Sequence, residues 1–449
     1  MMNLTTPLPL VALGLMWQQA QPASPSVPRA AASSAVTEIL PDAFPAPLQI
    51  PQDVDLALCL DTSGSMGGLL DSARQRLWSL VNELALAEPT PRLRVALLTY
   101  GTPGYGADSG FVQTALPLTE DLDMVSLKLF ELTTNGGDEY VARVTQTATE
   151  SLAWSAEPNA LKMIVVAGNE SAEQDPLFTL EAACGSAISK GIVVHSLYCD
   201  ETGQGGQTLQ GRATRNSQAQ SIAAPVPQTT ATPSTNLAPQ PLSVIALGWK
   251  KVAQLSDGAF AMIQTQNGAP VIETPFDTVL MELSTSLNET YIPYGSGSAW
   301  ALGNQQVQDS NASGLNNDAA ANRAVSKAGK LYFCSWDLLD SLGNGTMTHG
   351  EIDPEQLPEP LRELSPEALR AHIEEKREAR AKLQAEITET GEKRSEWLVR
   401  KRLELGTDET KAFDTPLRKA FRELAQARGF RFAQPKQEQP ATASEPEAE

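Results

Sequence analysis

The sequence predicts an α/β fold, with a doubly wound, mostly parallel central sheet flanked by helices, followed by a mainly α-helical extension. The first observation is that short apolar runs alternate with segments of helical spacing between residues 53 and 287. The second is that several runs are apolar throughout, as in parallel strands covered on both faces. The third is that Ser365, Pro366 and Glu367 form a helix start before a long charged stretch.

The predicted elements of the sheet domain follow in chain order. Strands are expected at residues 55–60, 93–100, 111–118, 161–167, 192–198 and 258–264. The third should be an edge strand, because its apolar residues alternate with polar ones. Helices are expected at residues 69–87, 121–132, 139–154, 173–190, 242–255 and 275–287. Ligands of such a sheet should bind at the carboxyl ends of its strands.

The extension is predicted in less detail. Gly, Ser and Asn dominate from residue 292 to about residue 317, before a helix-prone segment. The long charged helix should run from Ser365 to about Leu405. Its apolar positions are sparse, and Arg380 and Arg394 interrupt a heptad pattern. A solvated helix docked along one side is therefore favoured over a coiled coil.

Composition divides the chain into five segments. We expect a signal peptide at residues 1–23, because residues 8–17 are an apolar run followed by small residues; the alternative is a disordered arm. A linker is expected at 24–50, the α/β domain at 51–290 with a disordered insertion at about 203–241, the helical region at 291–430, and a disordered acidic tail at 431–449. The protein should be exported, to the periplasm or the cell exterior, with no membrane span in the mature chain.

Charge excludes some functions. The formal net charge is −20, so binding to nucleic acid through its phosphates is not expected, nor is adsorption to an anionic membrane. Acidic proteins suit divalent cations or basic partners, although solubility alone also accounts for such a charge.

One motif carries chemistry. Asp61-Thr62-Ser63-Gly64-Ser65 stands where a buried strand ends and a helix begins. One carboxylate and two hydroxyls on a tight loop suit a hard cation such as Mg²⁺. The alternative is a metal-free loop in which Ser63 and Ser65 cap the following helix.

This segment resembles the metal-ion-dependent adhesion site of von Willebrand factor A domains. Asp61, Ser63 and Ser65 match its first motif, and Gly136-Gly137-Asp138 resembles its Gly-Gly-Thr loop with Asp138 in place of the threonine. The family's later Asp is replaced by Gly168. The resemblance implies that Asp61, Ser63, Ser65 and Asp138 hold Mg²⁺, or another divalent cation such as Mn²⁺ or Ca²⁺. It further implies a protein partner that contributes an acidic residue to the metal.

Four cysteines are present, and none forms a Cys-x-x-Cys pair, so a zinc or iron–sulfur site is not expected. Cys184 begins a descending helix and Cys199 ends the next strand, both at the top of the sheet. We therefore expect a Cys184–Cys199 disulfide, with two buried thiols as the alternative.

Three other functions were weighed. The chain is not expected to be an enzyme, because aspartyl phosphotransferases need a second acid where Ser63 stands and no acid–base set is evident; a metal-dependent hydrolase is the alternative. Residues 340–351 resemble a calcium loop, but Leu342 occupies a ligand position. A metal-independent scaffold, using the sheet domain and the long helix, is the remaining alternative.

Overall fold

The computed structural model describes residues 52–200, 242–263, 271–405 and 414–432. The predicted signal peptide, linker and insertion all lie outside these residues. Arg431 and Phe432, predicted to begin the disordered tail, instead form strand β8 and pair with Ala87–Glu88, strand β2; the rest of the predicted tail lies outside the described residues. Among the described helices, none combines the length and apolar character needed to cross a bilayer.

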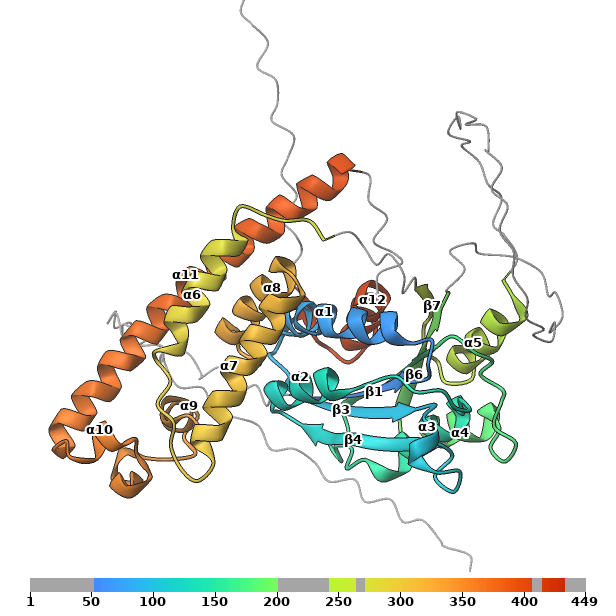
Figure 1. Cartoon of the computed structure of the whole chain (residues 1–449), viewed down its shortest axis with the longest axis horizontal. Helices are drawn as coiled ribbons and strands as arrows, with labels where there is room; N and C mark the ends of the chain where they lie inside the picture. Colours follow the sequence, from blue (N-terminus) through green and yellow to red (C-terminus); the bar gives the residue numbers. More distant parts are fainter. Residues whose placement is uncertain (1–51, 201–241, 264–270, 406–413, 433–449) are drawn as a thin grey trace, which may run out of the picture. The chain divides into compact units, whose positions relative to one another are not determined.

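The central sheet has six strands in the order β4-β3-β1-β5-β6-β7 (Figure 1). Only edge strand β4 (Val112–Thr119) runs antiparallel to its neighbour. The predicted α/β fold, with its mostly parallel sheet, is confirmed. The parallel strands are β1 (Asp53–Asp61), β3 (Arg92–Tyr100), β5 (Leu161–Gly168), β6 (Ile192–Cys199) and β7 (Phe260–Ile263).

Helices cover both faces of the sheet. On one face lie α1 (Gly67–Leu84) and α2 (Leu122–Glu131), whose apolar sides share a core with alternate residues of β1 and β3. The remaining residues of these strands face the second core, which contains α3 (Val141–Ser151), α4 (Leu180–Ser189) and α5 (Val244–Gln254). Helix α4 starts seven residues later than predicted, because Thr179 is its N-cap and Asp175 accepts from the amides of residues 177 and 178.

The helical region packs against α1 and α2. Helix α6 (Asp277–Asn288), predicted to close the sheet domain, instead shares a separate core with α8 and α11 through Leu280 and Leu287. Figure 1 shows α6 and α11 side by side. The other elements of this region are α7 (Ser298–Leu315), α8 (Asn317–Ala328), α9 (Leu338–Gly343), α10 (Glu359–Arg362), α11 (Pro366–Leu405) and α12 (Asp414–Ala427), with 3₁₀ turns at Pro103–Tyr105, His349–Glu351 and Pro354–Gln356.

Candidate metal site

The Asp-x-Ser-x-Ser loop is held at the carboxyl edge of the sheet. Asp61 is the last residue of β1, and Thr62 donates both its amide and its hydroxyl to the Tyr100 carbonyl at the end of β3, at 2.8 and 2.9 Å. The Ser63 amide donates to Asp61 Oδ1 at 2.7 Å. These bonds fix the turn, so the side chains of Asp61 and Ser63 stay at the mouth of the sheet.

The two serine hydroxyls are not used to cap the next helix. The N-cap of α1 is Met66, with no side-chain hydrogen bond to the helix amides, so the capping alternative is wrong. Ser63 Oγ lies 3.5 Å from Ser65 Oγ. Asn169 Nδ2, from the segment after β5, donates to Ser65 Oγ at 2.9 Å. Two hydroxyl oxygens therefore lie together beside the Asp61 carboxylate.

A second acid, Glu139, lies against Asp61. A Cβ placed on Gly101 would stand 2.8 Å from Asp61 Oδ1 and 3.2 Å from Glu139 Cγ, so both side chains crowd the same point. Glu139 is 6% exposed and Asp61 is fully buried. Burial raises the pKa of Asp61 to about 6. Burial and the neighbouring Asp61 charge raise the pKa of Glu139 to about 9. Two adjacent buried carboxyls need a proton or a cation between them.

The structure does not bring Asp138 to this pair. Asp138 is exposed, and its carboxylate accepts from the Tyr140 hydroxyl at 3.4 Å. The sequence reasoning missed Glu139, the next residue along. Two acids follow Gly136-Gly137, so the sequence indicated an acidic side chain at this loop. It did not indicate which of the two acids lies against Asp61.

The loop that carries Glu139 passes close to its neighbours. The Asn135 amide donates to the Thr62 carbonyl at 2.8 Å. A Cβ on Gly137 would lie 2.6 Å from the Gly101 carbonyl oxygen, so only glycine allows this approach. The loop is thus attached both to the Asp-x-Ser-x-Ser turn and to the end of β3.

Gly168, where the resemblance predicts an Asp, has surroundings that leave no space for a side chain. A Cβ there would lie 2.5 Å from the Tyr100 hydroxyl and 3.0 Å from Asp61 Oδ2. The Tyr100 hydroxyl donates to the Ala167 carbonyl at 2.9 Å and is fully buried. Tyr100 therefore occupies the volume that an Asp at position 168 would need.

The residues present suit a hard divalent cation. Asp61 Oδ2 is buried without a hydrogen-bond partner, and leaving a buried carboxylate oxygen unsatisfied is costly. In the part of the chain that the structure describes, no cluster of three or more His, Cys, Asp or Glu is placed to hold a metal. A cation here would therefore depend on the two serine hydroxyls and water as well as on carboxylates, which is a donor set typical of Mg²⁺.

Two other predicted sites differ in the structure. The Cys184–Cys199 disulfide is not formed. Cys184 lies in the core under α3, α4 and α5, whereas Cys199 lies in the core on the opposite face of the sheet. Both cysteines were expected at the carboxyl end of the sheet. Successive residues of a strand face opposite sides of the sheet, however, and Cys199 faces the side that α4 does not cover.

The calcium loop is also absent from residues 340–351. Asp340 contacts Arg380 at 2.9 Å and accepts from the Cys334 amide, while Glu351 accepts from the Thr348 amide and hydroxyl in a capping box. The first and last acids of the loop are thus engaged with different partners.

Comparison with known proteins agrees with this fold. Residues 55–226 match the family model of the von Willebrand factor type A domain. The chain therefore contains a von Willebrand factor type A domain, joined to a helical C-terminal region. No match was found among curated proteins.

Several solved structures are similar at low identity. An aerotolerance-related membrane protein from Bacteroides fragilis is 17% identical, over 47% of this chain and 91% of that one, with a TM-score of 0.28. A von Willebrand factor type A protein from Catenulispora acidiphila is 15% identical, over 47% and 39%, with a TM-score of 0.30. Proximal thread matrix protein 1 from the mussel byssus, with a zinc-occupied MIDAS motif, is 11% identical, over 33% and 36%, with a TM-score of 0.28. The chain thus spans well under half of the last two proteins.

Proposed function

We propose that this protein is an exported binding protein whose von Willebrand factor A domain holds a divalent metal and recruits an acidic residue of a protein partner. The observation that supports this most is the buried Asp61 Oδ2, which has no hydrogen-bond partner and lies beside two serine hydroxyls. A hard cation would satisfy that oxygen and take the place of the proton that Asp61 and Glu139 otherwise need between them.

The protein ligands in this proposal are four side chains, which bind the metal directly or through water: Asp61, Ser63, Ser65 and Glu139. Glu139 takes the place first expected of Asp138, because it is the acid packed against Asp61. When bound, Mg²⁺ supplies a Lewis acid that accepts an oxygen from outside. The contribution of this chain is to hold the two hydroxyls and two carboxylates in place, through the Thr62–Tyr100 and Asn169–Ser65 hydrogen bonds.

Binding rather than catalysis is the role that these groups support. Ser63 stands where an aspartyl phosphotransferase needs its second acid. His195 is buried in β6 with Nδ1 accepting from the Ala259 amide, and His349 and His372 belong to the helical region. Acid–base chemistry at Asp61 would need a partner group that these histidines do not provide.

The metal step is tested by titrating the EDTA-treated protein with Mg²⁺ in a calorimeter. Asp61→Asn and Glu139→Gln should each weaken Mg²⁺ binding at least about tenfold, because each removes one ligand charge. The matched control, Asp138→Asn, should change Mg²⁺ affinity less than about twofold, since Asp138 is exposed and its carboxylate contacts the Tyr140 hydroxyl. Asp61→Asn is expected to be at least as stable as the wild type in EDTA, because it removes a costly buried charge.

The pH dependence of the same titration follows from the raised pKa values. Below about 6 for Asp61 and about 9 for Glu139, protons occupy the sites that the metal needs. Mg²⁺ must displace them, so its affinity should rise between pH 5 and pH 8 in the wild type. Equal Mg²⁺ affinity in Asp61→Asn and wild type would contradict the site.

The partner step is tested by a pull-down from the native envelope fraction, with wild type and Asp61→Ala, in Mg²⁺ and in EDTA. A partner retained only by wild type in Mg²⁺ supports metal-dependent binding. A partner that survives both EDTA and Asp61→Ala would instead favour the metal-independent scaffold.

A further inference from the structure

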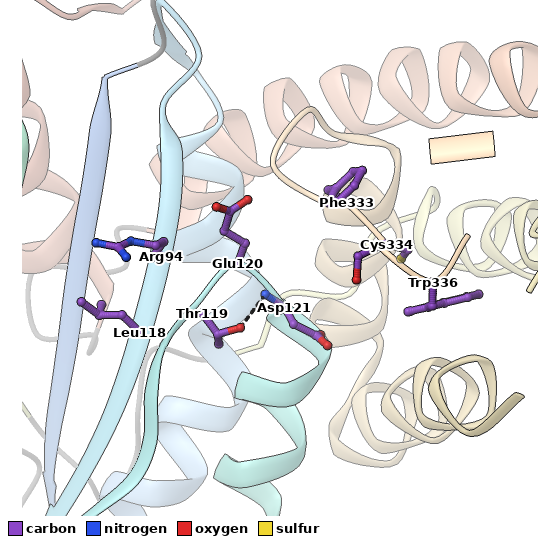
Figure 2. A pocket seen from close by; sticks show the side chains of 9 residues that line it. Arg94, Leu118, Thr119, Glu120, Asp121, Phe333, Cys334 and Trp336 are labelled. Atoms are coloured by element: carbon purple, nitrogen blue, oxygen red, sulfur yellow. Dashed lines mark hydrogen bonds between the residues drawn. The ribbon is translucent and has the colours of Figure 1, made fainter. Parts of the chain in front are cut away.

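A cavity of about 390 Å³ lies between the sheet domain and the helical region, away from the metal site. One wall is formed by Leu118 of β4 and by Glu120 and Asp121 of the turn that joins β4 to α2, and the other contains Phe333 and Trp336 (Figure 2). Arg94, near the start of β3, also lines the cavity. Pockets of this volume bind small ligands or single large side chains.

The walls are fixed by buried polar contacts. On the sheet side, Asp123 of α2 accepts from Arg323 Nη1 at 2.8 Å and from the Tyr332 hydroxyl at 2.6 Å, which ties the start of the 332–336 segment to α2. At the far end of that segment, the Trp336 carbonyl accepts from the Tyr294 amide at 2.8 Å. The cavity is therefore preformed, and a ligand would not have to order it.

The charge that faces the cavity is negative. The charge of Arg94 is neutralised, because its Nε and Nη2 donate to the two Asp55 carboxylate oxygens, at 2.8 and 2.7 Å. Glu120 approaches Arg92 only at 4.0 Å, and that arginine already binds Asp53 at 2.8 Å. Asp121 accepts from two amides of α2 through Oδ1, and burial together with the nearby Asp123 charge raises its pKa. A cation in the cavity would relieve this excess of negative charge.

The aromatic side chains of Phe333 and Trp336 favour one kind of cation over another. Figure 2 shows the rings of Phe333 and Trp336 across the cavity from Glu120 and Asp121. Aromatic faces attract cations, and a planar guanidinium both stacks on a ring and donates to carboxylates as a fork. An ammonium group would use the charge but not the stacking, so arginine is favoured over lysine.

We propose that this cavity binds an arginine side chain presented by a basic segment of a partner protein. The carboxylates of Glu120 and Asp121 attract its guanidinium, and the aromatic side chains of Phe333 and Trp336 offer it rings on which to stack. Because Arg94 and Tyr100 are six residues apart on β3, the cavity lies about 20 Å from the metal site at the opposite end of the strand. Arginine binding in the cavity needs no metal. A test of the cavity can therefore fail or succeed independently of the test of the metal site.

The test uses the full chain in EDTA at about 0.15 M salt, which suppresses diffuse attraction to the acidic surface. The probe is N-acetyl-arginine amide, followed by ligand-observed saturation-transfer NMR, with the uncharged citrulline analogue as its matched control. The arginine probe should bind with a Kd on the order of 1 mM, as expected for so few atoms. The citrulline probe should bind at least tenfold more weakly.

Variants locate the binding. Glu120→Gln combined with Asp121→Asn should weaken the arginine probe at least tenfold, and asparagine keeps the N-cap of α2. Phe333→Leu should weaken it severalfold. Glu131→Gln, an exposed acid at the other end of α2, should have no effect, and Asp61→Asn should leave the probe bound while weakening Mg²⁺ binding. Equal binding of the two probes, or unchanged binding to the Glu120/Asp121 double variant, would overturn the proposal.

Discussion

At the scale of single residues, the part of the site that lies at the end of a strand could be predicted and the part on an irregular loop could not. Asp61 and Ser63 follow a buried strand directly, so the periodicity of the strand places them at its carboxyl edge. Glu139 lies on a loop with no period, and its direction depends on how closely Gly137 approaches the Gly101 carbonyl. That contact joins residues far apart in the sequence, so no local pattern distinguishes Glu139 from Asp138.

Gly168 offers a prediction at the same scale. Gly168→Ala should destabilise the protein by about 1–3 kcal/mol, because its Cβ would stand 2.5 Å from the buried Tyr100 hydroxyl. Combining it with Tyr100→Phe should recover part of the loss, since the hydroxyl is removed. Urea unfolding in EDTA measures both.

The matched control is Gly185→Ala within α4, where a Cβ meets no atom within 4 Å. Alanine in that open helical position should stabilise by roughly 0.5–1 kcal/mol. If Gly168→Ala were as well tolerated as Gly185→Ala, the proposed displacement of the family's Asp by Tyr100 would be wrong.

At the scale of elements, helix α11 was well predicted but the role of its arginines was not. Its bounds agree with the predicted 365–405 helix, and the Ser365 hydroxyl accepts from the Ala368 amide. Arg380 and Arg394 seemed to interrupt a heptad, yet both are buried on the docked side. Their partners, such as Asp337 and Asp277, come from distant segments, and a single helix's pattern cannot show them.

Helix α7 shows the opposite case, in which local composition pointed away from a helix. Its Gly, Ser and Asn content is unfavourable for helix formation. Tertiary contacts offset this: Gln308 accepts from the Ser126 hydroxyl of α2 at 2.8 Å, and Gln305 donates to the Tyr332 hydroxyl at 3.0 Å. Buried polar side chains thus dock α7 on the sheet domain where an apolar stripe is missing.

Arg394 permits a test of how α11 is held. Arg394→Met should destabilise the protein by about 3–5 kcal/mol, because it leaves the buried Asp277 carboxylate without its cation and leaves Asp318 with the more distant Arg76, at 3.4 Å. Arg394 binds Asp277 of α6 and Asp318 of α8, each at 2.7 Å. Urea unfolding measures the loss. The adjacent Lys393→Met, which breaks an exposed pair with Glu389, should cost no more than about 1 kcal/mol. Similar losses for the two variants would show that the buried pairs contribute little.

At the scale of the whole molecule, the predicted division at residue 290 does not follow the packing. Phe421, Ala425 and Phe430 belong to the same core as α1 and β1. Arg323 lies 4.6 Å from the ring of Trp78 in α1, and Asn82 donates to the Asn322 carbonyl at 2.9 Å. Composition changes near residue 291 suggested a boundary, but composition does not reveal that later helices cover the outer side of α1.

A fragment of residues 51–290 should therefore fail to fold as a stable monomer, whereas 51–432 should fold. Each buried phenylalanine lost from the core removes about 1.5–3 kcal/mol, and the uncovered Trp78 and Asp123 add to this. Such a sum is comparable with the 5–15 kcal/mol that typically stabilises a domain. Near-ultraviolet circular dichroism and urea unfolding distinguish the outcomes. A cooperative transition with native near-ultraviolet signal in fragment 51–290 would show that the sheet domain is autonomous, and that the helical region is an attachment rather than part of its core.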